Sequence, residues 1–401
     1  MTTENTETPG SAEASALATA LRMSADELDE GARNGTADKA LGDARAALSK
    51  RLVTPADTGA SLRKKLEGAT VTLSPDYFST APKPRDWLLM RPGDNGDSHV
   101  GVFPAGKVGM LAAAGGVGKT AALVRLALSV ATGREWFKGG WFPPTRGRVL
   151  LALGEEDAEE IQRRVYYTAL EMGLDPAARK LAVDNITALP LAGIPLPFVQ
   201  QGANGNAVEA EGLDAIRDIL DKRAGDGWRL LIFDPLSRFA SSDAEKDNAQ
   251  ATRLIQAFEC LTSVKGGPGV LVAHHTSQQS RKDGDASTSA ARGVTALTDG
   301  VRWVASLTPR NESAPKDAKA AWRRTELALT KTNYGPPAEP LYLVNDGGVL
   351  RAETDAEETE REVEGVDSGK SIAKGKSNKV SARGSSASER HIDAGEPPST
   401  L

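Results

Sequence analysis

The chain has few of the features that mark a membrane, secreted or metal-binding protein. Its single cysteine, Cys260, excludes an intrachain disulfide, and we expect it to be a core residue. No apolar stretch approaches the roughly 18 residues that a membrane-spanning helix needs. The first residues also lack the basic and apolar regions of a signal peptide. These absences predict a cytoplasmic protein that binds no membrane.

Charge is not concentrated enough to attract nucleic acid in bulk. The formal net charge is −5, so any nucleic-acid binding must come from local patches. With 39% hydrophobic but only 5% aromatic residues, the composition is typical of a globular core with poorly packed terminal segments.

Composition divides the chain into three parts. Residues 1–80 are rich in alanine and acids with weak helical periodicity, which fits either an interaction arm with short helices or plain disorder. Residues 82–352 carry the core. Residues 353–401 combine an acidic run with a Ser/Gly-rich basic stretch, which predicts a disordered tail. The basic half of this tail either touches nucleic acid or, more simply, is a solvated tail.

The core alternates short apolar runs with helical segments. Nearly continuous apolar runs are typical of strands covered on both faces, and intervening helices make such a sheet mainly parallel. The predicted strands are 108–112, 148–153, 230–234, 269–273 and 301–307, followed by a closing hairpin of 325–331 and 340–344. The sequence therefore predicts an α/β fold with a mainly parallel central sheet, flanking helices and a C-terminal β-hairpin.

A phosphate-binding loop follows the first of these strands. Glycines allow backbone N–H groups to approach an oxyanion, the lysine adds a charge for the β- and γ-phosphates, and the threonine offers a hydroxyl to Mg²⁺. The following helix directs its positive end at the phosphates. The residues predicted to hold ATP are Ala114, Gly115, Gly116, Val117, Gly118, Lys119 and Thr120. Ala113 stands where the usual motif has its first glycine, and a small residue still packs there.

Acidic residues end two further strands. Four apolar residues precede Asp234, the pattern of a Walker B strand, and we expect its carboxylate to hold Mg²⁺ directly or through water. The strand after the phosphate loop ends before Glu155, Glu156 and Asp157. RecA-type ATPases keep a water-orienting glutamate at this position. We assign that role to Glu155, because Glu156 and Asp157 stand where acids at a helix N-terminus are favoured in any case.

Two histidines and a polar loop follow the fourth strand. The pair His274 and His275 suggests a sensor of the γ-phosphate, whereas the sequence offers no partner ligands at a zinc spacing. The loop 276–291 is polar and fits either single-strand binding or an ordinary surface loop. Arg292 directly follows this loop, where an arginine can reach a neighbouring subunit's phosphoryl group.

Seven segments in order carry a family resemblance: VGMLAAAGGVGKT, VLLALGEEDAEEIQRRV, LLIFDPLSRFA, VLVAHHTSQ, ARGVTALTDGVRW, LTKTNYGPP and DGGVL. Over roughly residues 82–352 the chain resembles the hexameric replicative DNA helicases of the RepA type, encoded by plasmids and phages, within the RecA-like AAA_25 group of ATPases. The resemblance implies ATP and Mg²⁺ as cofactors, Glu155 as the catalytic base, His275 as the sensor and Arg292 as a finger in trans. It also makes Lys331 a candidate phosphate contact near the subunit boundary.

The resemblance implies single-stranded DNA and further copies of the chain, as a hexameric ring, as partners. Gln278 departs from the family, which often has lysine there, and the two extensions lack counterparts, so they could tether a primase or a replication initiator. The leading prediction is an ATP-driven helicase, and the alternative is a RecA-like DNA-binding ATPase that regulates or assists recombination without unwinding. A small-molecule kinase is disfavoured, because Glu155 does not fit it and no lid or acceptor site is evident.

Overall fold

The computed structural model describes residues 63–64, 66–93, 98–202, 204–240, 247–275, 295–310 and 323–359. The chain divides into two compact units at Pro84 and Arg85. In the first unit the described residues form a helical turn over 66–69 and the short helix α5 (Asp76–Ser79). The second unit carries the sheet and the other elements.

A nine-stranded sheet forms the centre of the second unit, in the order β13-β12-β11-β10-β3-β9-β8-β4-β5. The strands from β10 to β5 pair in parallel, and β10 to β13 pair antiparallel. Its members are β3 (Val108–Ala113), β4 (Arg148–Leu153), β5 (Ile186–Pro190), β8 (Trp228–Asp234), β9 (Gly269–His275), β10 (Trp303–Pro309), β11 (Arg323–Thr332), β12 (Leu341–Asp346) and β13 (Val349–Ala352). Two antiparallel pairs lie outside it: β1 (Trp87–Pro92) with β2 (His99–Pro104), and β6 (Val199–Gln201) with β7 (Ala207–Glu209).

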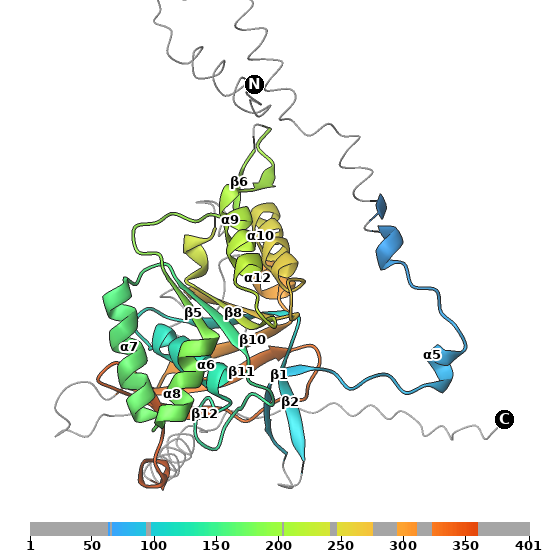
Figure 1. The fold of residues 1–401 in the computed structure, drawn as a ribbon. Helices are drawn as coiled ribbons and strands as arrows, with labels where there is room; N and C mark the ends of the chain where they lie inside the picture. Colours follow the sequence, from blue (N-terminus) through green and yellow to red (C-terminus); the bar gives the residue numbers. More distant parts are fainter. Residues whose placement is uncertain are drawn as a thin grey trace, which may run out of the picture. The chain divides into compact units, whose positions relative to one another are not determined.

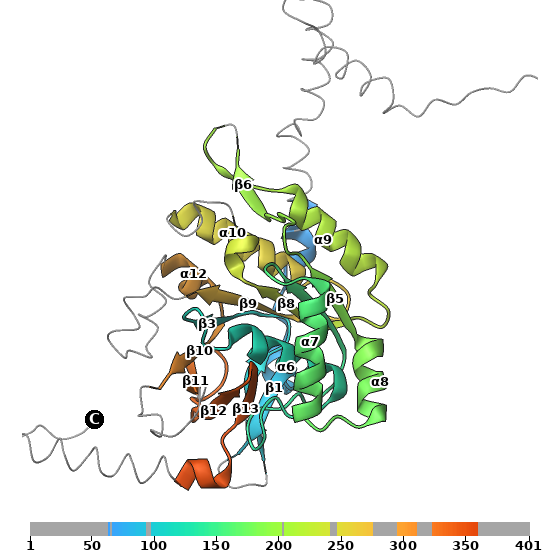
Figure 2. The ribbon, with the colours of Figure 1, turned by 90° about the vertical axis from the view of Figure 1, so that its left-hand side faces the viewer.

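Helices cover both faces of this sheet (Figures 1 and 2). One apolar core joins the sheet to α6 (Lys119–Thr132), α7 (Ala158–Glu171) and α8 (Pro176–Asn185). The other core joins it to α9 (Glu211–Lys222), α10 (Asn248–Leu261) and α12 (Thr295–Gly300), with the 3₁₀ turn η1 (Leu236–Arg238) after β8. Side chains alternate between the two cores along each strand: Leu271 and Ala273 of β9 belong to the first, Val270 and Val272 to the second.

The predicted fold class is confirmed. Each predicted strand is present, and β4 has the predicted bounds. The sheet contains one parallel strand that the sequence did not reveal, β5 at the edge beside β4. A turn after β12 leads to β13, which extends the closing hairpin by one strand.

Two expectations are wrong. Cys260 is exposed on α10 and is not a core residue. Order also continues beyond residue 352, because residues 355–359 are helical and Glu357 is only 6% exposed. Both guanidinium nitrogens of Arg351 donate to the Glu357 carboxylate, at 2.8 and 2.9 Å, and hold this turn against β13. Among the described residues, no helix is both long and apolar enough to cross a membrane.

Candidate functional site

The phosphate loop lies where the parallel strand β3 gives way to α6. The backbone φ angles of Gly116 and Gly118 are 75° and 104°, a conformation that side chains with a Cβ rarely adopt. This geometry lets the loop turn sharply and places the N-terminus of α6 at its end. Loop and helix thus form the strand-loop-helix unit that the sequence predicts.

Four predicted site residues converge beside this loop. The hydroxyl of Thr120 donates to Asp234 Oδ2 at 2.6 Å, which joins the start of α6 to the end of β8. The Nζ atom of Lys119 lies 3.0 Å from His275 Nδ1 at the end of β9. Because β3, β8 and β9 are parallel neighbours, their carboxyl ends bring these groups to one edge of the sheet.

Burial sets the electrostatics of this cluster. Asp234 is 4% exposed, and burial raises the pKa of its carboxyl, against the hydrogen bond from Thr120 and the charge of Lys119. Burial likewise lowers the pKa of the Lys119 ammonium, while the nearby charges of Asp234 and Glu155 raise it. A bound divalent cation would supply positive charge opposite the Asp234 carboxylate, and phosphate oxygens would supply negative charge opposite the Lys119 ammonium.

The donor set fits a magnesium ion that completes its coordination with phosphate oxygens and water. Mg²⁺ is usually held by one or two carboxylates plus substrate phosphates. Thr120 and Asp234 provide a hydroxyl and one carboxylate within hydrogen-bonding distance of each other. Among the described residues there is no cluster of three or more His, Cys, Asp or Glu side chains that could hold a metal alone.

The three acids after β4 separate into different roles. Asp157 caps α7, its side chain accepting from the amide of Glu160 at 2.8 Å. Glu156 pairs with Arg164 at 2.8 Å, and burial raises the pKa of its carboxyl. Glu155 is half-exposed, and its negative charge acts on both Lys119 and Asp234. Glu155 is therefore the acid of this group that faces the phosphate site without a structural partner on α7.

An arginine that the sequence did not single out lies beside Glu155. Arg238, on η1, donates to Glu155 Oε1 at 3.3 Å. Its side-chain stem crosses Gly154, where a Cβ would come within 2.6 Å of Arg238 Cγ. The amide of Gly154 donates to the carbonyl of Asp234 at 2.7 Å. Glycine at position 154 thus leaves room for the side chain of Arg238. The only sequence signal for this contact was the glycine directly before the three acids.

His274 points to the opposite face of the sheet from His275. It is 4% exposed, and burial together with the charge of Lys119 lowers its pKa to about 4. Since Val270 and Val272 of the same strand belong to the core on the α10 side, alternation places the His274 ring on that side too. Its Nδ1 atom has no hydrogen-bond partner among the described residues. Of the two histidines, only His275 reaches the phosphate loop.

A second arginine ties the phosphate-loop helix to the C-terminal hairpin. Arg125 of α6 is buried, pairs with Glu171 of α7, and donates to the carbonyl of Leu350 in β13 at 3.3 Å. A Cβ on Gly118 would lie 3.3 Å from the side-chain nitrogen Nδ2 of Asn345 in β12. The hairpin therefore lies against the phosphate loop, a contact between distant sequence segments that no local pattern predicts.

One predicted site residue does not join this cluster, and another lies outside the described residues. Lys331 lies beside Val304 near the start of β10, towards the opposite edge of the sheet, and donates to the carbonyls of Thr298 and Asp299 at 2.8 and 3.1 Å. The structure does not bring it to the phosphate loop of its own chain. Arg292 lies outside the described residues, as do Gln278 and the 276–291 loop.

The phosphate loop, Walker B carboxylate and strand order are those of a P-loop ATPase, and a family comparison agrees. Residues 67–281, more than half of the 401 residues, match the AAA_25 family, described as an AAA domain. The chain belongs to this family. The AAA domain thus includes the loop, Glu155, Asp234 and His275, whereas β10 to β13 lie beyond the matched residues.

Solved structures similar to the chain include one described as an ATPase domain, at 16% identity and a TM-score of 0.42. That similarity covers 62% of this chain and 85% of the other. A DnaB-like replicative helicase, solved with attention to its interactions with primase, is 16% identical with a TM-score of 0.43. There the similarity covers 86% of this chain and 77% of the other.

Proposed function

We propose that this AAA domain hydrolyses ATP to drive a ring-shaped motor along single-stranded DNA. The observation that carries the proposal is the convergence of Lys119, Thr120, Asp234 and His275 beside a glycine-rich loop, with Glu155 at the same edge. A nucleoside kinase or a simple nucleotide-binding switch does not require an acid at the position of Glu155. Hydrolysis does, because water must be oriented for attack.

Each residue then has a distinct task. The amides of residues 114–118 and the ammonium of Lys119 hold the phosphates, and Thr120 with Asp234 would hold Mg²⁺, which supplies charge neutralisation when it is bound. Glu155 orients the attacking water and accepts its proton. His275, in contact with Lys119, senses whether the γ-phosphate is present.

The remaining features of the proposed motor are the arginine finger, the role of Lys331, the DNA-binding loop and the two extensions. They depend on contacts with other copies or on residues outside the described part of the chain. We propose that Arg292 reaches the γ-phosphate of a neighbouring copy, which makes hydrolysis depend on a closed ring. Lys331, far from its own phosphate loop, would contact phosphate only across such an interface. The 276–291 loop would follow the DNA strand, and the extensions 1–80 and 353–401 would tether a primase or a replication initiator.

Two measurements on one preparation test the proposal. The full chain should hydrolyse ATP faster when single-stranded DNA is added, and should release the labelled strand of a forked duplex. Lys119→Ala should abolish both activities, because the phosphates lose their buried cation. DNA-stimulated hydrolysis without strand release would instead identify a DNA-binding ATPase that regulates or assists recombination. Hydrolysis indifferent to DNA would contradict both functions.

A further inference from the structure

Arg238, which donates to Glu155, is a half-exposed side chain on a rigid support. It lies on η1 directly before Phe239, which is fully buried. The Phe239 ring packs against Phe198 and Phe233, with ring centres 5.3 and 5.1 Å away, and its carbonyl accepts from the Phe198 amide at 2.8 Å. The aromatic core on the α10 side therefore fixes the backbone from which Arg238 projects.

The path of the Arg238 side chain across the end of β4 is equally constrained. A Cβ on Gly154 would come within 2.7 Å of Arg238 Cβ and 2.6 Å of its Cγ, so the stem lies directly over the glycine. From there the Nη2 atom reaches Glu155 Oε1 at 3.3 Å. The glycine before the acid thus leaves the space through which the guanidinium reaches the carboxylate.

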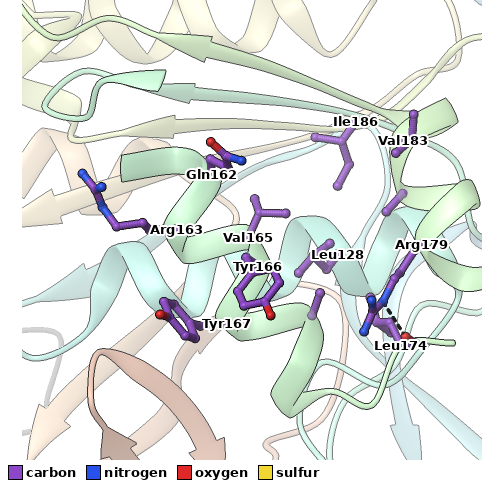
Figure 3. Close-up of a pocket in the computed structure, with 12 residues that line it drawn as sticks. Leu128, Gln162, Arg163, Val165, Tyr166, Tyr167, Leu174, Arg179, Val183 and Ile186 are labelled. Atoms are coloured by element: carbon purple, nitrogen blue, oxygen red, sulfur yellow. Dashed lines mark hydrogen bonds between the residues drawn. The ribbon is translucent and has the colours of Figure 1, made fainter. Parts of the chain in front are cut away.

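The arginines of α7 make their ion pairs with another acid. Arg163 pairs with Glu160 at 3.0 Å and projects from α7 at the rim of the groove between α6, α7 and α8 (Figure 3). Arg164 pairs with Glu160 as well, at 3.1 Å. In the described part of the chain, Arg238 is therefore the cation that is paired with Glu155.

This ion pair is better suited to orienting a carboxylate than to stabilising the fold. The side chains of Arg238 and Glu155 are 55% and 51% exposed, and ion pairs between exposed groups contribute little to stability. Among the described residues, only Oε1 of Glu155 has a hydrogen-bond partner, so Oε2 is available. The negative charge of Glu155 still acts on Lys119 and Asp234 of the phosphate site. A general base needs this combination, because one oxygen must take the proton while the group itself is held in place.

We propose that Arg238 is a positioning residue for hydrolysis, which holds Glu155 by Oε1 so that Oε2 faces the attacking water. This inference rests on the proposed function, in which Glu155 accepts the proton of that water. Arg238 then contacts neither nucleotide nor water and acts only through Glu155. Its substitution should change the rate of the chemical step and leave the affinity for ATP unchanged.

Steady-state hydrolysis by the full chain, with saturating single-stranded DNA, tests this role. Arg238→Gln should lower kcat by about tenfold, part of the roughly hundredfold or more that a general base contributes, and leave the KM for ATP within about twofold. Arg238→Lys should recover part of the loss, because an ammonium group can also hold a carboxylate. A raised KM with an unchanged kcat would overturn the proposal, because Arg238 would then be a contact of the nucleotide itself.

The matched control is an ion pair of the same exposure at another place. Arg134 pairs with Asp175 at 3.1 Å, with side-chain exposures of 55% and 52%, and it follows the end of α6 that is remote from the phosphate loop. Arg134→Gln should keep kcat within about twofold of the parent value, since an exposed pair contributes little to stability. An equal loss of kcat in Arg134→Gln and Arg238→Gln would contradict a specific role for Arg238.

A double-mutant cycle separates action through Glu155 from a direct effect. Single-turnover hydrolysis with excess protein measures the slow Glu155→Gln variant. Adding Arg238→Gln to it should slow the reaction no further, because the arginine has lost the group that it positions. A further loss of about tenfold would refute the proposal, since independent effects multiply. If Glu155→Gln kept the parent kcat, the proposed role of Glu155 would fail as well, whereas a loss in Glu155→Gln with none in Arg238→Gln would refute this inference alone.

Gly154→Ala tests the same contact with every charge in place. The added methyl group displaces the Arg238 stem, so kcat should again fall by about tenfold with the KM for ATP unchanged. Parent-like turnover in this variant would count against the contact. Thermal unfolding checks the fold, and the Tm of Arg238→Gln should lie within about 2 °C of the parent. A fall of several degrees would instead identify Arg238 as a structural residue and overturn the proposal.

Discussion

Substitution of single residues in the phosphate site tests their proposed roles one at a time, and the acids after β4 offer the clearest comparison. Glu155→Gln should lower kcat by about a hundredfold or more, because an amide cannot accept the proton of the attacking water. Glu156→Gln should stay within roughly threefold, since Glu156 pairs with Arg164 on α7. The comparison uses ATP turnover at saturating DNA, with nucleotide binding measured in parallel. A larger loss for Glu156→Gln would exchange the two assignments.

The buried His274 makes stability depend on pH. Its pKa is about 4 in the folded chain and is close to 6.5 when unfolded, so the unfolded state binds the proton first as pH falls. Stability should therefore decrease between pH 6.5 and 4, by roughly 2–3 kcal/mol from this group. Urea unfolding of the nucleotide-free protein should reveal this slope. His274→Gln should remove it, whereas the exposed His99→Gln should leave it unchanged.

At the scale of elements, the helical turn after β13 is held by one buried carboxylate. The Arg351 guanidinium, with the Thr354 amide, lowers the pKa of Glu357 to about 2. This contribution is present above the unfolded pKa near 4.5 and is lost as pH falls towards 2. Glu357→Gln should cost about 1–2 kcal/mol at pH 7, after allowance for solvent screening. The urea midpoints of variant and parent should converge as pH falls from 4.5 towards 2, and a gap independent of pH would contradict the ion pair.

The strands show what the sequence could and could not predict. Buried parallel strands are continuous apolar runs, so β3, β4, β8 and β9 were located to within two residues. The edge strand β5 is only partly buried, and its five residues carry no such run. The sequence did not predict the turn at 355–359, because composition alone cannot reveal that one glutamate among many is buried against a partly buried arginine.

The sequence predicted those site residues that end or directly follow a strand. It did not predict those that come together only through packing between distant segments. Lys119, Thr120, Asp234 and His275 each follow or end a recognisable strand, and the structure brings them together. Arg238 and the hairpin contact at Gly118 depend on the tertiary approach of separate elements. Lys331 lies towards the opposite edge of the sheet from its own phosphate loop, so its contact with phosphate near a subunit boundary stays a prediction.

At the scale of the whole molecule, the proposal that Arg292 acts on a neighbouring copy can be tested by mixing defective copies. Arg292→Ala should bind ATP but hydrolyse it about a thousandfold more slowly, as expected for loss of an arginine finger. Glu155→Gln alone should also have little activity, for the reason given above. Mixed, the two should recover part of the activity, because some interfaces then pair an intact Glu155 with an intact Arg292. Full turnover by Arg292→Ala alone, or no recovery in the mixture, would refute the assignment.

Strand β9 ends in two histidines that face opposite sides of the sheet. His275 contacts Lys119 beside the phosphate loop, and His274 is packed against the side that α10 and α12 cover. Successive side chains of a strand point to opposite faces of the sheet. A shift of one residue in the pairing register of β9 would exchange the faces of the two rings, so this register decides which histidine reaches the phosphate loop.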